Sequence, residues 1–364
     1  MNPFTLNYQT DLFCDRASET EQLNSNIVNG LNTLLHGPRR LGKSALLHHL
    51  FNIYENGNEY ETLFVDLFAT QNMEDFIRLF AEQILEKYHK KNILTGIKNL
   101  LKGLSPSVSF SPDGTTKLSL TLNENQRETT LQQLFSYFEK RKKKVVIAFD
   151  EIQEIANYPE KAEAILRSHV QGVKNIQFIF SGSSNHILQE MFNSPQRPFY
   201  QSTEVMVLDK ISKSTYAEFI NTLFARYGKT IDQDAVDHIL EFTEVYTYYT
   251  QVISNQAFSK TEKKLNHNES AIITHNYIEN RKSDYQAFLS LLPENQKRLA
   301  IAIAKEGLVK VPSSIDFIMR NNLPSASSTL LAVKTLLNKE IIYKTHEGYV
   351  IYDIFFKRFL QIFY

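Results

Sequence analysis

One stretch of the sequence has the residue types and the spacing of a phosphate-binding loop. Gly37 is followed by four residues and then by Gly42, Lys43 and Ser44, which is the full pattern G-x-x-x-x-G-K-[ST]. The glycines let the loop curl so that backbone N–H groups point at phosphate oxygens, the lysine reaches the β- and γ-phosphates, and the serine hydroxyl binds Mg²⁺. We therefore predict a nucleotide site with these binding residues: Gly37, Pro38, Arg39, Arg40, Leu41, Gly42, Lys43, Ser44 and Ala45.

Two acidic residues stand at the end of an apolar run further along the chain. The segment KVVIAFDEI, residues 144–152, is a strand candidate that ends in Asp150 and Glu151. In enzymes with a phosphate loop, an aspartate at this strand end holds Mg²⁺ and a following glutamate orients and deprotonates the attacking water. We predict the first role for Asp150, with Ser44 as the other Mg²⁺ ligand, and the second for Glu151. The alternative is that the two acids only cap the helix that follows.

Small hydroxyl residues end the next apolar run, FIFSGSS, which closes at residue 184. In P-loop enzymes with an inserted central strand, a polar residue at this strand end contacts the γ-phosphate or the attacking water. Ser181, taken as catalytic, and Ser183 are the candidates here. Simple N-capping of the next helix is the competing interpretation. Arg197, in SPQRPFYQS, is the candidate for an arginine finger, which stabilises the charge of the transferring phosphoryl group.

Arg39 and Arg40 lie inside the predicted loop, and their side chains are not required as phosphate ligands, because backbone amides already line such a cradle. Three uses stay open for them: ion pairs with acidic neighbours, contact with a partner across a subunit interface, and simple solvation at the loop tip.

The elements that position these residues alternate between strands and helices. Short apolar runs predict strands at residues 32–37, 61–69, 144–152 and 176–184, and amphipathic patterns predict helices between them. This order favours a mainly parallel sheet in a three-layer α/β fold. Residues 106–122 instead alternate polar and apolar residues around Pro-Asp-Gly, which predicts an inserted β-hairpin at about residues 104–124. We assign residues 1–208 to this core.

The pattern turns helical from about Leu208. Residues 209–285 hold successive amphipathic stretches and are predicted to form a helical lid. Residues 286–364 hold three helix candidates followed by two short strands around Glu347-Gly348, which is the order of a winged helix-turn-helix. Its recognition helix would be residues 325–340.

Composition narrows the class of protein. The 364 residues carry 40 basic and 40 acidic side chains, so the formal net charge of +0 does not indicate nucleic-acid or membrane binding by the chain as a whole. The lone cysteine, Cys14, excludes an internal disulfide and suits a reducing compartment. We find no signal-peptide pattern and no apolar run long enough to span a bilayer. A cytoplasmic location without membrane contact is the expectation.

The segments DLFCDRASETEQL, LLHGPRRLGKSALL, VVIAFDEIQEI, FIFSGSSNHILQEMF and RPFYQS together resemble the archaeal-type ATPase family, a STAND-class group of P-loop NTPases related to AAA+ proteins. The resemblance covers nearly the whole chain and implies an AAA+-like core, a helical lid and a C-terminal winged helix. It also implies that ATP is the nucleotide, that Phe13 and Arg16 with Glu19 wrap its adenine side, and that slow hydrolysis drives a conformational switch.

Two segments depart from this family's pattern. Many relatives carry Gly-Arg after the aromatic residue that here is Tyr200, whereas this chain has Gln201-Ser202. The lid carries Tyr246-Thr247 where relatives often have His-Pro or Gly-Pro before two tyrosines. We expect these tyrosines to be core residues rather than nucleotide sensors.

The leading hypothesis is a Mg-ATP-dependent switch ATPase with a winged-helix output domain. Oligomer formation on ATP binding is left open. The first alternative is a DNA-binding regulator in which ATP only sets conformation. It has weak support: the recognition helix offers only Lys334 and Lys339, and residues 291–364 hold ten Lys and Arg against six Asp and Glu. The second alternative is a nucleotide-gated scaffold with negligible turnover. A protein partner would bind through the lid or the winged helix.

Overall fold

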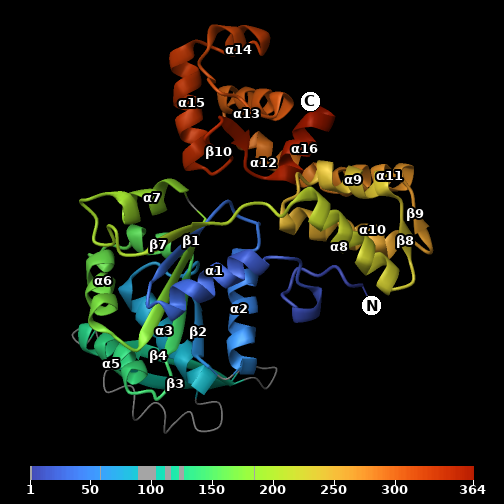
Figure 1. The fold of residues 1–364 in the computed structure, drawn as a ribbon. Helices are drawn as coiled ribbons and strands as arrows, with labels where there is room; N and C mark the ends of the chain where they lie inside the picture. Colours follow the sequence, from blue (N-terminus) through green and yellow to red (C-terminus); the bar gives the residue numbers. More distant parts are fainter. Residues whose placement is uncertain (1, 58, 89–103, 111–115, 123–126, 184) are drawn as a thin grey trace. The chain divides into compact units, whose positions relative to one another are not determined.

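The computed structural model describes residues 2–57, 59–88, 104–110, 116–122, 127–183 and 185–364, and the chain divides into two compact units. One unit comprises residues 7–210, and the other comprises residues 1–6 and 211–364. Figure 1 shows the helices and strands of both. No helix in the described part of the chain is long and apolar enough to cross a membrane.

The unit of residues 7–210 is built on a five-stranded sheet in which every pair of neighbours is parallel. From edge to edge the strands are β2 (Glu61–Asp66), β5 (Val145–Asp150), β6 (Ile176–Gly182), β1 (Thr33–His36) and β7 (Glu204–Val207). Every residue of β5 and β6 is buried, which explains their continuous apolar runs, because a parallel sheet is covered on both faces. The predicted parallel α/β core is confirmed.

Helices cover both faces of this sheet. One apolar cluster joins alternate residues of β5, namely Val145, Ile147 and Phe149, to the helices of one layer. These helices are α3 (Met73–Tyr88), α5 (Arg127–Glu139), α6 (Ala162–Gly172) and α7 (Asn185–Asn193). The other layer holds α1 (Ala17–Val28) and α2 (Lys43–Gly57), which contribute nothing to that cluster and lie on the opposite side of the sheet (Figure 1). The three predicted layers are therefore present.

An antiparallel hairpin is inserted between α3 and α5. Its strands are β3 (Leu104–Phe110) and β4 (Thr116–Leu122), which pair from Leu104 opposite Leu122 to Phe110 opposite Thr116. The predicted insert is confirmed, while the Pro-Asp-Gly turn, residues 112–114, lies outside the described residues.

The second unit is mainly helical. Its first part holds α8 (Lys213–Arg226), β8 (Thr230–Ile231), α9 (Gln233–Phe242), α10 (Thr247–Lys260), β9 (Lys264–Leu265), α11 (His267–Glu279) and α12 (Lys282–Ser290). Its second part holds α13 (Glu294–Glu306), α14 (Ile315–Arg320), α15 (Ala326–Asn338), β10 (Ile342–Lys344), β11 (Tyr349–Ile351) and α16 (Ile354–Phe363). The three helices and antiparallel ribbon of a winged helix are present. A division between lid and winged helix at residue 285 stays a prediction.

The last helix, α16, joins these two parts of the unit. Lys357 Nζ lies 2.7 Å from Glu244 Oε1, and Arg358 donates to the carbonyls of Glu241 and Phe242 at 2.7 and 2.9 Å. These carbonyls lie at the end of α9; that of Glu241 also accepts from the Glu244 N–H at 3.3 Å, and the guanidinium gives each carbonyl a further donor. The Phe355 ring also packs against Tyr249 and Tyr277, with centroids 4.6 Å apart in each pair.

The tyrosine-rich segment, residues 246–249, packs at the same junction between the two parts of the second unit. Tyr249 is only 1% exposed, and the Tyr246 hydroxyl lies 2.5 Å from the Tyr343 hydroxyl of β10. Tyr246 and Tyr249 are therefore part of the core of the second unit, as predicted, whereas Tyr248 is 36% exposed, so the prediction is wrong for that tyrosine.

The first residues of the chain belong to this unit and not to the unit that follows them in sequence. Asn2 Nδ2 donates to the Asn255 carbonyl at 2.8 Å, and Asn255 Nδ2 donates to the Phe4 carbonyl at 2.6 Å. Phe4 is 1% exposed and packs against Phe224 and Phe258. The chain therefore crosses between the two units twice, near residues 6 and 210.

Candidate nucleotide-binding site

The predicted phosphate loop connects the end of β1 to the start of α2 at Lys43. Arg40 and Gly42 adopt positive φ angles of 70° and 93°, a conformation that costs energy for arginine and little for glycine. Gly37 is required for another reason, since a Cβ there would lie 2.5 Å from the Leu208 carbonyl oxygen. Leu208 comes this close because its N–H donates to the His36 carbonyl at 2.7 Å. The loop is thus held in a curled form.

Lys43 is buried with neutral partners. It is 6% exposed, and its ammonium donates to the carbonyls of Gly37 and Pro38 at 2.9 and 3.0 Å. Burial lowers the pKa of Lys43 from 10.5 to about 8, although Glu151 and Asp150 act in the opposite direction. A buried charge with only neutral hydrogen-bond partners is costly unless a counter-ion binds. This position fits the phosphate group that the loop pattern predicts.

Oxygen ligands for a hard cation meet beside this lysine. Ser44 Oγ donates to Asp150 Oδ2 at 2.5 Å, and Asp150 is 4% exposed. Asp66 lies opposite Asp150 in the β2–β5 pairing. Burial raises the pKa of Asp66, and the charges of Asp150 and Glu151 add to this effect.

This oxygen set fits Mg²⁺. Within the described ranges no three His, Cys, Asp or Glu side chains could hold a metal ion together. Mg²⁺ in nucleotide sites needs only one or two protein oxygens, with phosphates and water as its other ligands. Ser44 and Asp150 provide these two oxygens side by side.

Glu151 follows Asp150 and begins the 3₁₀ helix η3 (Ile152–Asn157) in a left-handed conformation, with φ of 52°. Its Oε2 accepts a hydrogen bond from Ser183 Oγ at 2.8 Å and another from the Gln153 side-chain amide. Arg39 Nε in turn donates to Ser183 Oγ at 3.1 Å. A carboxylate held in this way beside a phosphate loop is suited to accept a proton from water.

The structure places the two candidate serines differently. Ser183 contacts Glu151, whereas Ser181 is fully buried in β6 opposite Leu35, and its hydroxyl has no hydrogen-bond partner among the described residues. The catalytic role assigned to Ser181 stays a prediction.

Arg197, the candidate arginine finger, lies in ion pairs within its own unit. Its guanidinium nitrogens are 3.2 Å from Glu163 Oε1 and 3.5 Å from Glu190 Oε1, on α6 and α7. Reaching another subunit would require both pairs to break, so the finger role also stays a prediction.

Arg16 and Phe13 pack beside the loop and its helix. Arg16 is 4% exposed, and its NH2 donates to the Asp209 carbonyl at 2.7 Å and to the Leu41 carbonyl of the loop at 3.4 Å. Its NH1 pairs with Glu19. The Phe13 ring stacks on His49 of α2, with centroids 4.2 Å apart. Arg16 thus ties the loop to the segment that leaves the core, and the predicted contact of both residues with adenine is not tested.

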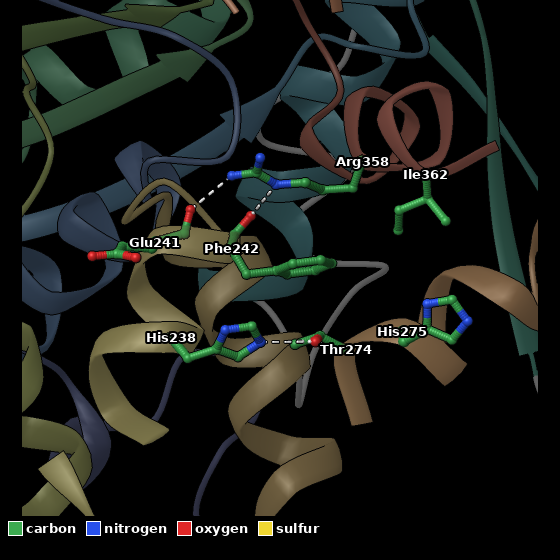
Figure 2. Close-up of a pocket in the computed structure, with 7 residues that line it drawn as sticks. All are labelled: His238, Glu241, Phe242, Thr274, His275, Arg358 and Ile362. Carbon is green, nitrogen blue, oxygen red and sulfur yellow. Dashed lines mark hydrogen bonds between the residues drawn. The ribbon is translucent and has the colours of Figure 1, made fainter. Parts of the chain in front are cut away.

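A further cavity lies in the second unit. Its volume is about 370 Å³, and Figure 2 shows the residues of α9, α11 and α16 that line it: His238, Glu241, Phe242, Thr274, His275, Arg358 and Ile362. Two hydrogen-bonding groups on its wall are already paired, because His238 Nε2 lies 3.0 Å from Thr274 Oγ1 and Arg358 binds the carbonyls that end α9. It has none of the phosphate-loop chemistry.

Sequence reasoning missed two groups in the site, Gln153 and Asp66. Both had a signal, because Gln153 stands two residues after Glu151 and Asp66 ends an apolar run. It also left the use of Arg39 open, and the structure gives this side chain a partner in Ser183.

Together the parallel sheet, the curled loop and the paired Ser44 and Asp150 define a P-loop NTPase fold, here combined with a winged helix. The family described as "ATPase domain predominantly from Archaea" matches residues 13–250, and a probable winged helix domain matches residues 283–362. The chain belongs to this archaeal-type ATPase family. No curated protein matches it in sequence.

Solved structures share the fold at low sequence identity. A Walker-type ATPase of Pyrococcus abyssi matches with a TM-score of 0.67 and 17% identity, over 99% of this chain and 100% of that one. The ORC2 protein of Aeropyrum pernix, solved with ADPNP and ADP, gives 0.61 and 12%, over 99% and 97%. The ORC1 protein of the same organism, solved in complex with DNA, gives 0.55 and 12%, over 98% and 95%.

Proposed function

We propose that this protein binds Mg-ATP at the phosphate loop and hydrolyses it to ADP and phosphate. The observation that carries the proposal is the contact between Ser44 and Asp150, 2.5 Å long, beside the buried ammonium of Lys43. The oxygens of Ser44 and Asp150 therefore lie beside the Lys43 ammonium, which has no carboxylate as a hydrogen-bond partner. The ADPNP and ADP bound by the Aeropyrum pernix ORC2 protein support a nucleotide in this fold.

Each group has a defined task in this proposal. The loop amides and Lys43 bind the phosphates, and Ser44 with Asp150 holds Mg²⁺, which supplies charge neutralisation at the β- and γ-phosphates when bound. Glu151 accepts the proton of the attacking water. Glu151 Oε2 accepts hydrogen bonds from Ser183 and Gln153, so the orientation of the carboxylate is fixed before nucleotide binds.

Glu151→Gln tests the reaction. We expect nucleotide affinity within about twofold of wild type and a fall in turnover of about 10²–10⁴-fold, the usual contribution of a general base. The assays are binding of a fluorescent ATP analogue and phosphate release over hours. Glu21→Gln, at an exposed position of α1, is the matched control and should leave both values unchanged. Equal turnover in Glu151→Gln and wild type would remove Glu151 as the base.

We further propose that the nucleotide acts as a switch, in the manner of STAND proteins. Switching requires that ATP and ADP bind two arrangements of the protein with different affinity. The division of the chain into two compact units supports a movement of one unit against the other. Particle size measured with ADP and with a non-hydrolysable ATP analogue tests this, and also tests oligomer formation. Identical scattering profiles in both states would contradict the switch.

DNA binding is the second candidate function, favoured by the winged helix and by the DNA complex of the Aeropyrum pernix ORC1 protein. The exposed side of α15 argues against a conventional recognition helix. Leu330 and Leu331 are 52% and 68% exposed there, beside Lys334, whereas phosphate neutralisation by several Lys and Arg residues dominates DNA affinity. A gel shift of the full chain with duplex DNA at low salt decides, and absence of a shift would exclude this function.

A further inference from the structure

Two hydrogen bonds on Glu151 end on the same carboxylate oxygen. Oε2 accepts from Ser183 Oγ at 2.8 Å and from Gln153 Nε2, and Oε1 accepts no hydrogen bond from the described residues. Two donors on one oxygen fix the plane of the carboxylate and leave the other oxygen able to take a proton. The arrangement therefore has the geometry that a positioned general base requires.

Gln153 can reach Glu151 because residue 182 is a glycine and has no side chain in the space that the Gln153 amide occupies. The glutamine is 2% exposed, and a Cβ at Gly182 would lie 2.3 Å from its Oε1 and 2.8 Å from Leu188 Cδ1. Oε1 has no hydrogen-bond partner among the described residues. The amide is thus oriented by its hydrogen bond to Glu151, by a side-chain hydrogen bond with Glu154 and by close packing against the end of β6.

Ser183 connects Glu151 to the phosphate loop. Its hydroxyl donates to Glu151 and accepts from Arg39 Nε at 3.1 Å, and the serine is 5% exposed. Because the Arg39 hydrogen bond occupies an acceptor position on the hydroxyl, it favours the rotamer in which the hydroxyl proton points at Glu151. Hydrogen bonds in such a chain polarise one another.

We propose that Gln153 and Ser183 are positioning residues that fix the Glu151 carboxylate for proton abstraction, with Arg39 orienting the Ser183 hydroxyl from the phosphate loop. The proposal rests on the hydrolysis proposed above. Its physical basis is that misplacing a catalytic group by about 1 Å costs about 10²-fold in rate. The two donors act on Glu151 and not on the nucleotide, so their loss should lower kcat without weakening binding.

Gln153→Met is the first test, because methionine keeps the length of the side chain and removes the donor. We expect kcat to fall about tenfold or more while the dissociation constant of a non-hydrolysable ATP analogue stays within about twofold. Ser183→Ala should show the same split. Gln177→Met is the matched control: this glutamine is also buried, at 8% exposure, in the first half of β6, and its change should leave both values within about twofold of wild type.

A double variant separates positioning from general packing. In the Glu151→Gln background, Gln153→Met should lower the residual turnover by less than about twofold, since it acts only through Glu151. A further tenfold loss there, or wild-type kcat in both Gln153→Met and Ser183→Ala, would overturn the proposal. If Gln153→Met binds no analogue because it does not fold, Ser183→Ala decides alone.

Gly182→Ala offers an independent route to the same result. Its methyl group would displace the Gln153 amide, so kcat should fall with little change in analogue binding. The same assays distinguish two failures. If wild-type turnover is no faster than that of Glu151→Gln, the proposed hydrolysis and the positioning role both fail. If wild type is faster but Gln153→Met and Ser183→Ala match it, only the positioning role fails.

Discussion

Among the residues that the structure describes, each unit buries one lysine, and the two lysines differ in their partners. Lys43 of the core unit is 6% exposed and Lys357 of the second unit is 7% exposed. Lys357 forms an ion pair with Glu244 at 2.7 Å, whereas Lys43 donates to two neutral carbonyls. The charge of Lys357 is neutralised by the protein itself, whereas the Lys43 ammonium has neutral hydrogen-bond partners and fits the phosphate of the proposed nucleotide. Equal burial therefore accompanies an internal ion pair in one unit and, in our proposal, ligand binding in the other.

The largest expected effect comes from Lys43→Met. It should weaken binding of an ATP analogue by about 100-fold or more, because the phosphates lose their buried cation. Thermal stability without nucleotide should not fall, because an apolar side chain replaces an ammonium whose burial costs desolvation free energy. Binding measured by fluorescence and melting followed by circular dichroism check both statements. Unchanged affinity would show that Lys43 has only a structural role, like Lys357, and would contradict the proposed nucleotide site.

Lys357→Met should show the opposite pattern. Its loss leaves Glu244, whose side chain is 27% exposed, without its closest cation, so we expect the free energy of unfolding to fall by about 1–3 kcal/mol. Nucleotide affinity should not change. Chemical denaturation and the same binding assay measure the two effects, and a loss of affinity comparable to that of Lys43→Met would contradict the separation of roles.

The pH dependence of binding sharpens the comparison. The folded-state pKa of Lys43, about 8, lies below its ordinary value of 10.5. Between these pH values the unfolded chain binds the extra proton, so the stability of the free protein rises with pH in this window. Bound phosphate favours the ammonium, so affinity for ADP should fall by roughly tenfold from pH 7.5 to 9.5. A flat titration over that range would show that Lys43 keeps its proton throughout.

The smallest effect is expected from Tyr343→Phe. This change removes the hydroxyl that lies 2.5 Å from the Tyr246 hydroxyl and leaves both rings in place. The free energy of unfolding should fall by about 0.5–1.5 kcal/mol. Turnover should stay at the wild-type value, because the contact belongs to the junction inside the second unit. A selective loss of turnover would instead link this tyrosine pair to the nucleotide site.

Local patterns predicted much of the fold from the sequence. The loop, the buried strands and the inserted hairpin each depend on residues close together in the chain, and each was confirmed. Strand β7 was missed because it is four residues long and exposed at three of them, so it lacks the apolar run that marks a buried strand. Helix α16 was missed because its nearly continuous apolar sequence, IFFKRFLQIF, hides the helical period.

The site was predicted less completely than the fold, for the same reason. The phosphate loop and Asp150-Glu151 are contiguous motifs, but the chain of hydrogen bonds from Arg39 through Ser183 to Glu151 joins three segments. Arg16 likewise finds its acceptor at Asp209, 193 residues away. Only the packing of the sheet brings such groups together. The sequence therefore shows which residue types are present but not which of them form hydrogen bonds with one another.

The position of the first six residues has a consequence for synthesis of the protein on the ribosome. Asn2 and Phe4 are translated before the core unit, but their partners Phe224, Asn255 and Phe258 are translated only after the whole of it. At about 5–20 residues per second, this delay is on the order of ten seconds or more. The segment of residues 1–6 therefore reaches its native partners only after the whole core unit has been synthesised.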